Sequence, residues 1–212
     1  SCRARLDPVP MGEQDVADPA DSTELRAFVR ALLDDLRTLE AMIETGRIAA
    51  PAVSQLAARL TDFYQQLPPV STSVEDYAQR LRQHLRANQE ELAAVEHGLD
   101  QRPIRRAQAA QWRFLRLASG LLANRVRDGR VVEGHGDLRP EHVYFTPSPV
   151  VIDCIEFNAD FRTIDVADEL AFLMMESEFL GAGSQLQPVL DCYCARSGDL
   201  LPPELLAFYK TY

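Results

Sequence analysis

The sequence predicts a mainly α-helical protein with one small β-hairpin, an α+β fold. Over most of the 212 residues, apolar side chains recur at the three- and four-residue spacing of amphipathic helices. In one short region, the apolar runs 143–145 and 150–152 lie on either side of a turn that contains Pro147 and Pro149. Two such runs around a proline-containing turn predict a hairpin. An apolar content of 46% is enough for a substantial core.

The first 21 residues predict an irregular lead-in, because prolines and a glycine interrupt any regular pattern. We expect a single domain over residues 22–212. It begins with a helix for which Ser22 is a suitable N-cap and which Gly46 ends. The next helix has Pro51 in its first turn and ends before a pair of prolines.

Two longer helices are predicted next. Ser73 and Asp76 form a partial capping box for a third helix that runs to about His97. Pro103 opens a fourth helix, which the apolar spacing extends without interruption to Val126. We expect the aromatic residues of this fourth helix to belong to the core.

Helical periodicity returns after the hairpin, from Val166 onward. A pair of glycines at 181 and 183 separates this helix from another near 186–195, and two prolines start a last helix over 204–212. The sequence ends there with neither a C-cap residue nor a polar tail, so we expect a chain that is truncated at its C-terminus.

The bulk composition excludes several classes of partner. A net charge of −10 and a pI near 4.9 argue against nucleic acid and against an anionic membrane, because both need a basic surface. No apolar run of about 18 residues and no signal-peptide pattern is visible, so we expect neither a membrane-spanning helix nor a signal peptide. The four cysteines have neither disulfide nor zinc-site spacing, which favours reduced thiols in a cytoplasmic protein.

The residues that carry chemistry lie in the loop 133–143 and directly after the hairpin. Asp137 is a carboxylate that can orient or accept the proton of an attacking hydroxyl, or it only caps a turn. Asp153 ends an apolar strand and needs a partner, which can be Mg²⁺, a cation of a salt bridge or a turn amide. His142 can ligate the metal or hydrogen-bond a phosphate, although Mg²⁺ prefers oxygen. Two carboxylates and an imidazole gathered by a tight turn suit metal-nucleotide phosphoryl transfer.

Two further residues are predicted to support this loop. His135, between two glycines, is expected to hold the loop through hydrogen bonds to the backbone. Asp165 begins an apolar helix, so it is either only an N-cap or a brace for the loop through the backbone amides.

Together these motifs resemble the aminoglycoside phosphotransferase family, which has a protein-kinase-like fold. The catalytic loop of the family matches His-Gly-Asp-Leu at 135–138, with His142 in the place of an Asn; its metal-binding Ile-Asp matches 152–153, and its Asp-x-Ala matches 165–167. The runs HGDLRPEHVY and IDCIEFN resemble an uncharacterised bacterial branch of this family. In that branch a His at the Asn position is usual, and a P-loop kinase-like domain is often fused downstream. The resemblance covers roughly residues 36–212.

The resemblance implies transfer of the γ-phosphate of ATP or GTP to a hydroxyl of a small molecule. It makes Asp137 the catalytic Asp, Asp153 the ligand of the nucleotide-bound Mg²⁺, His142 the second metal-side residue and Asp165 the brace of the loop. No Gly-rich phosphate loop or strand Lys is present, and the single lysine is Lys210. We therefore expect the large lobe of a kinase-like fold without the small lobe, inactive by itself.

Two other functions are compatible with the residues. His142 in place of an oxygen ligand, together with the missing small lobe, suggests a non-catalytic kinase-like binding module. A metal-dependent hydrolase that uses His135, Asp137, His142 and Asp153 is a third hypothesis, but the sequence lacks the paired-His spacing of a zinc site.

Overall fold

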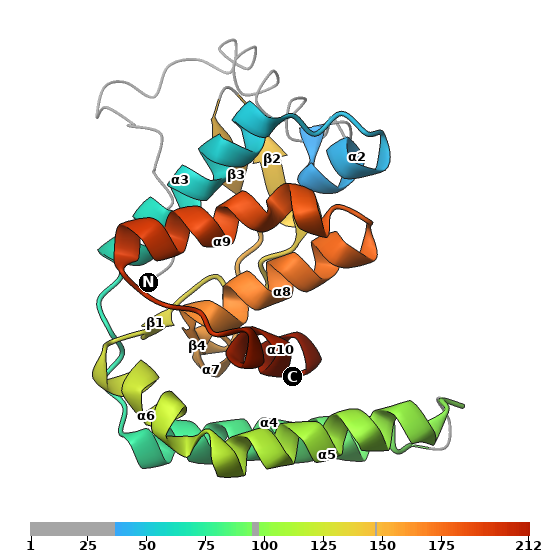
Figure 1. Ribbon diagram of the computed structural model, residues 1–212, viewed down its shortest axis with the longest axis vertical. Coiled ribbons are helices and arrows are strands. Elements are labelled where there is room, and N and C mark those ends of the chain that lie inside the picture. Colours follow the sequence, from blue (N-terminus) through green and yellow to red (C-terminus); the bar gives the residue numbers. More distant parts are fainter. Residues whose placement is uncertain (1–36, 95–97, 147) are drawn as a thin grey trace, which may run out of the picture.

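The computed structural model describes residues 37–94, 98–146 and 148–212. The predicted lead-in, most of the first helix with Ser22, and His97 lie outside these residues. In chain order, the elements are α2 (Leu39–Glu44), α3 (Ala50–Gln66), α4 (Val74–Leu92), α5 (Gln101–Leu117), α6 (Ser119–Arg127), β1 (Val131–Glu133), the 3₁₀ helix η5 (Pro140–His142), β2 (Val143–Phe145), β3 (Pro149–Val151), α7 (Ala159–Arg162), β4 (Thr163–Asp165), α8 (Val166–Phe179), α9 (Gly183–Ser197) and α10 (Pro203–Thr211) (Figure 1).

The predicted α+β class is confirmed, because helices dominate and the strands are short. The expected hairpin is formed by β2 and β3, which pair antiparallel with Val143 opposite Val151. A second antiparallel pair, β1 with β4, was not predicted; it places Val131 opposite Asp165 and Glu133 opposite Thr163. This second pair joins the start of the loop that carries Asp137 to the start of α8.

The prediction of one continuous fourth helix is wrong. The helix is interrupted at Ala118, where φ is −101° and ψ is 20°, so that α5 ends at Leu117 and α6 begins at Ser119. Ser119 and Gly120 follow the break directly, and both are weaker helix formers than the residues around them. The interruption was not visible in the sequence because the apolar spacing continues across it. The third helix also ends earlier than expected, at Leu92.

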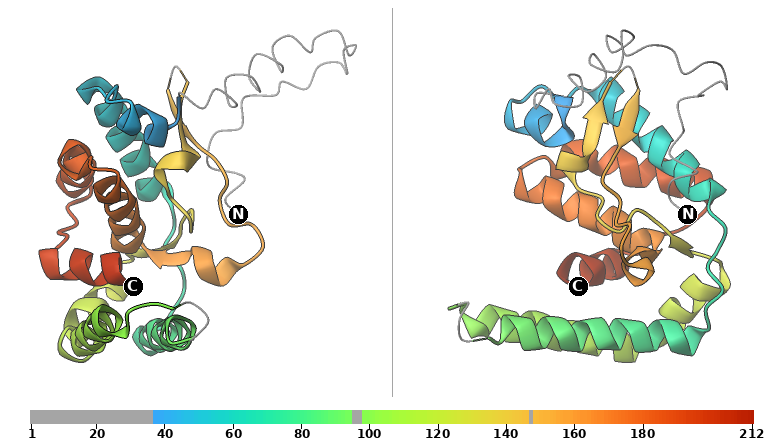
Figure 2. Two further views of the ribbon diagram at one scale, coloured as in Figure 1. Left: turned by 90° about the vertical axis from the view of Figure 1, so that its right-hand side faces the viewer. Right: turned by 180° about the vertical axis from the view of Figure 1, so that it is seen from behind.

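The elements pack around two neighbouring apolar clusters. In the first cluster, α3 lies along α9, and α8 packs against α9, with the β2–β3 hairpin at the edge (Figures 1 and 2). The second cluster joins α4, α5 and α6 to α10 and to Ala167 and Ala171 on α8. Helix α8 therefore contributes to both cores. Among the described residues, no helix is at once long and apolar enough to cross a membrane.

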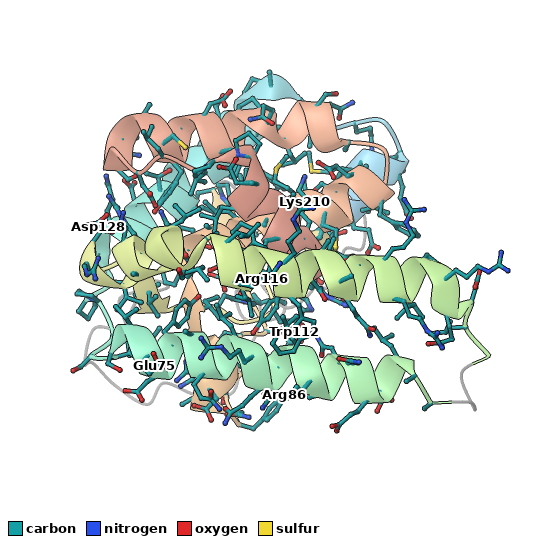
Figure 3. All side chains as sticks on the ribbon, turned by 60° about the horizontal axis from the view of Figure 1, so that its bottom comes forward. Glu75, Arg86, Trp112, Arg116, Asp128 and Lys210 are labelled. Carbon is teal, nitrogen blue, oxygen red and sulfur yellow. The ribbon has the colours of Figure 1, made fainter. Side chains whose placement is uncertain are left out.

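Helices α4 and α5 lie side by side over their length (Figure 3). The guanidinium carbon of Arg86 on α4 lies 5.9 Å from the ring centroid of Trp112 on α5. Trp112 and Phe114 are partly buried and pack against the second cluster, and Phe114 stacks on Phe208 of α10. The aromatic residues of the predicted fourth helix thus belong to the core, as expected.

A buried ion-pair network connects α6 to the start of α8 and to the segment between α9 and α10. Arg125 donates to both carboxylate oxygens of Asp165, at 2.6 and 2.8 Å, and also binds Asp199. Tyr209 donates to Asp165 at 3.0 Å and Tyr193 donates to Asp199 at 2.7 Å. Burial lowers the pKa of Arg125, but the hydrogen bonds and charges of the two aspartates outweigh burial and raise it. Arg130 also pairs with Asp199, at 3.7 Å, so two arginines face the two buried carboxylates.

Replacing Arg125 by Met is expected to lower the free energy of unfolding by about 3–5 kcal/mol, because buried Asp165 loses its cation and Asp199 keeps only Arg130, at 3.7 Å. Urea unfolding of the variant measures this change. Arg196→Met is the matched control, since Arg196 pairs with Asp62 on the surface, where both side chains are more than two-fifths exposed, and an exposed pair contributes about 1 kcal/mol or less. Equal losses for the two variants would contradict the assigned role of the network.

Candidate active site

The loop between β1 and η5 brings the predicted residues to the hairpin. Gly136 has φ +88°, and a Cβ at this position would lie 3.0 Å from the backbone oxygen of Phe161, so the turn requires glycine. Pro140 begins η5, in the first turn of a helix, where a missing N–H costs nothing. The 3₁₀ helix ends at His142 and leads directly into β2. Asp153 follows β3, the partner strand of β2.

His135 is buried and is held by backbone groups on both ring nitrogens. Its Nε2 lies 2.8 Å from the backbone oxygen of Ile152, which can only accept, so Nε2 carries the proton. Its Nδ1 therefore accepts from the backbone N–H of Asp137, at 3.3 Å. The imidazole thus ties the loop to the residue that precedes Asp153.

The ring of His142 lies between Asp137 and Asp153. Its Nδ1 lies 2.8 Å from the backbone oxygen of Asp137 and therefore donates to it. In the neutral ring, the lone pair is then on Nε2, which lies 3.6 Å from Oδ2 of Asp153 and 3.6 Å from Oε1 of Glu141. A backbone carbonyl that fixes the tautomer in this way is the usual arrangement around a metal-binding histidine.

Asp137 and Asp153 present their carboxylates on either side of this ring. Oδ2 of Asp137 lies 3.7 Å from Nδ1 of His142, and Oδ1 lies 3.2 Å from Nε of Arg139. Asp153 is 77% exposed, and its φ of +64° makes it the one non-glycine residue in the left-handed region among the described residues. Aspartate tolerates this conformation better than most side chains, and such strain is concentrated at functional sites. The structure therefore brings Asp137, His142 and Asp153 together.

The expected role of Asp165 as a brace of the loop differs from what the structure shows. Both of its oxygens are occupied by Arg125, Tyr209 and the backbone N–H of Ala167, where Asp165 is the N-cap of α8. The loop amide is held instead by Glu169, whose Oε1 accepts from the N–H of Gly136 at 2.6 Å. Asp165 is prevented from doing so because its carboxylate is already used by the buried network.

Glu169 is the functional residue that the sequence analysis missed. It is buried on α8, about one turn after Asp165, and its Oε2 accepts from the hydroxyl of Tyr64 on α3 at 2.7 Å. Burial raises the pKa of Glu169, while the nearby His135 and the hydrogen bonds from Gly136 and Tyr64 oppose this shift. The sequence does contain one indication of this role: Glu169 is an acidic residue on the apolar face of a helix, and a carboxylate buried there needs a polar partner.

Two hollows meet at Asp137. The inner cavity, of about 390 Å³, lies between α4, the loop at 136–138, the start of α8 and α10. The outer hollow, of about 710 Å³, is bounded by Asp153 and the following segment to Phe157, with Phe161. Asp137 lines both of them. Among residues 37–94, 98–146 and 148–212, no three His, Cys, Asp or Glu side chains converge as a ready-made metal site.

Glu169→Gln and Glu169→Ala are expected to affect the free energy of unfolding differently, since Gln removes the titrating group and Ala also removes the hydrogen-bond acceptors. Because the folded-state pKa of Glu169 is raised, its contribution to stability is complete below the unfolded pKa and is lost as the pH rises through the folded value. Gln keeps an acceptor for Gly136 without the charge, so its stability relative to the parent protein should increase from pH 4 to pH 8. Ala removes the carboxylate that accepts from Tyr64 and from the buried amide of Gly136, and should cost about 1–3 kcal/mol. Thermal unfolding across this pH range measures both effects, and a pH-independent difference for Gln would contradict the assignment.

Comparisons with known proteins assign the chain to a family. The model of the phosphotransferase enzyme family matches residues 11–185. Over 210 residues, the chain is 30% identical to Uncharacterized protein Rv2004c of Mycobacterium tuberculosis (strain ATCC 25618 / H37Rv) and to Uncharacterized protein Mb2027c of Mycobacterium bovis. These alignments cover 95% of this chain but 41% of each relative, so the chain spans less than half the length of the curated relatives it matches. No solved structure matches the chain significantly.

The family match covers most of the chain and includes the loop with Asp137, the hairpin, Asp153 and the start of α8. The chain belongs to the phosphotransferase enzyme family.

Proposed function

We propose that this chain is the large-lobe part of an enzyme that transfers the γ-phosphate of ATP or GTP to a hydroxyl of a small molecule. The observation that carries the proposal is the position of Asp137 between two hollows, one of which also contains Asp153. A phosphoryl-transfer site needs two such compartments, one for the nucleotide phosphates and one for the acceptor, with the acceptor hydroxyl at their junction.

On the side of the outer hollow, Asp153 and His142 are the residues that would hold Mg²⁺. Mg²⁺ is usually bound by one or two carboxylates together with phosphate oxygens and water. The exposed carboxylate of Asp153 and the Nε2 lone pair of His142, 3.6 Å apart, fit this pattern, although nitrogen is a less favoured ligand for this ion. The bound ion would neutralise the charge of the transferring phosphoryl group.

On the other side, Asp137 would orient the acceptor hydroxyl and take its proton during transfer. Phosphoryl transfer depends mainly on positioning and charge neutralisation. The position of Asp137 is set by its own backbone, since its N–H donates to His135 and its carbonyl accepts from His142. Glu169 adds a third constraint at the neighbouring Gly136. The carboxylate itself is 35% exposed and open to both hollows.

Other properties support a small-molecule acceptor and a cytoplasmic enzyme. The net charge of −10 disfavours nucleic acid and anionic membranes as partners. The cysteines at 154, 192 and 194 are free thiols, as in proteins of reducing compartments. The much greater length of the relatives agrees with a full-length protein that carries a further domain, for which a fused P-loop kinase-like domain is the proposal.

Asp137→Asn in the full-length protein is expected to lower the rate of acceptor-dependent nucleotide consumption by about 10²–10⁴, the usual contribution of a general base. Nucleotide affinity should change little, because Asp137 faces the hydroxyl. Asp128→Asn is a matched control: Asp128 is exposed at the end of α6 (Figure 3). Turnover that survives in Asp137→Asn would refute the catalytic role and favour a binding module.

Asp153→Asn should raise the Mg²⁺ concentration needed for half-maximal nucleotide binding by at least about tenfold, since it removes the charged ligand of the ion. Calorimetric titration of the full-length protein with nucleotide at several Mg²⁺ concentrations measures this dependence, again with Asp128→Asn beside it. An unchanged Mg²⁺ dependence would show that Asp153 does not hold the ion.

A further inference from the structure

The inner cavity limits what the acceptor can be, provided that the proposed function holds. Its volume of about 390 Å³ is near the lower end of the range for small-molecule sites, about 300–1,000 Å³. The wall is made mostly of aromatic and aliphatic side chains from α4, the 155–164 segment, α8 and α10, among them Leu81, Ile164 and Phe172. A compact ligand with an apolar body fits this space.

The tyrosine hydroxyls of the wall are already paired with protein groups. Tyr209 donates to the carboxylate of Asp165, so the proton between Tyr77 and Tyr209, 3.0 Å apart, comes from Tyr77. The hydroxyl of Tyr212 lies 2.5 Å from Nδ1 of His84. These rings therefore present apolar surface to the cavity.

Three of the charged side chains of the wall are also engaged. Arg80 donates to the backbone oxygen of Thr163 at 2.9 Å and pairs with Asp160 at 3.6 Å. The carboxylate of Glu169 accepts from Gly136 and from Tyr64. A polyhydroxylated ligand would find few free groups here, and each hydrogen bond to water that is lost on entry without replacement costs affinity.

Asp168 is the exception on this wall. It lines the cavity on the first turn of α8 and is partly buried, and its carboxylate has no hydrogen bond or ion pair to any residue that the structure describes. Burial raises its pKa well above the usual range, and the negative charges of Asp165 and Glu169 add to this shift. A protonated carboxyl in an apolar cavity can donate one hydrogen bond to a neutral oxygen and accept another.

We propose that the acceptor is a compact, uncharged alcohol with an apolar ring, and that Asp168 selects it by hydrogen bonding to a second oxygen while the reacting hydroxyl lies at Asp137. Asp168 is thus a specificity-determining residue of the inner cavity. The cavity wall offers such a molecule apolar contact over its body and polar partners at two points.

The test uses full-length protein and three ring-bearing probes of similar size. 2-Phenoxyethanol is uncharged and carries a hydroxyl and an ether oxygen, phenylalaninol adds an ammonium group, and D-glucose is polyhydroxylated. Ligand-observed NMR measures binding, and nucleotide consumption measures transfer.

We expect 2-phenoxyethanol to bind at least about tenfold more tightly than the other two probes. Asp168→Asn, which keeps both hydrogen-bonding functions, should change this affinity by less than about threefold, and Asp168→Leu should weaken it by about tenfold.

Several outcomes would overturn the inference. One is equal binding of 2-phenoxyethanol to the Leu variant and to the parent protein; absence of binding to the parent protein is another. A preference for phenylalaninol that Asp168→Asn abolishes would make Asp168 the counter-charge of a cationic acceptor instead. Thermal unfolding confirms that both variants fold. Binding of 2-phenoxyethanol without any transfer would count against the proposed phosphotransferase function alone, and would leave the binding preference of the cavity standing.

Discussion

The carboxylate of Asp165 is fully buried and is held there by Arg125, and the position of the site depends on this ion pair. Asp165 ends β4, pairs with Val131 of β1 and caps the first turn of α8. A buried carboxylate without a cation is costly, so the pair constrains α6 and the start of α8 to one relative position. With α8 placed, Glu169 reaches the amide of Gly136 and holds the loop that carries Asp137.

From that point, the geometry of the site is set mainly by backbone hydrogen bonds. The two histidines each bind a backbone carbonyl, His135 that of Ile152 and His142 that of Asp137. Each bond fixes a tautomer and joins two segments of the site. Asp153, just after the hairpin, lies within 3.6 Å of His142 and has a left-handed backbone conformation. The carboxylates of Asp137 and Asp153 are left accessible, whereas the ring of His142 is mostly buried between them.

Membership of the phosphotransferase enzyme family and the two hollows that meet at Asp137 support the same chemistry from independent directions. The family match rests on the sequence, whereas the hollows arise from packing: the inner cavity from α4, α8 and α10 around the loop, and the outer hollow from the segment 153–157 with Phe161. The inner cavity has an apolar wall because most polar groups around it are already paired with other groups of this chain. Family and acceptor chemistry are therefore separate questions here.

The sequence by itself determined the α+β class, most helices, the hairpin and the set Asp137, His142 and Asp153, because periodicity, proline positions and short-range spacing are local properties. It did not reveal the break at Ala118, because the apolar spacing continues across it, or the pairing of β1 with β4, which depends on contact between distant segments. Only the tertiary structure decided that Asp165 serves the buried network and that Glu169 holds the loop. Asp165 does not reach the amide of Gly136, and Glu169 does, because Arg125 is packed against Asp165. Arg125 and Asp165 are 40 residues apart in the chain, so no local sequence pattern encodes their contact.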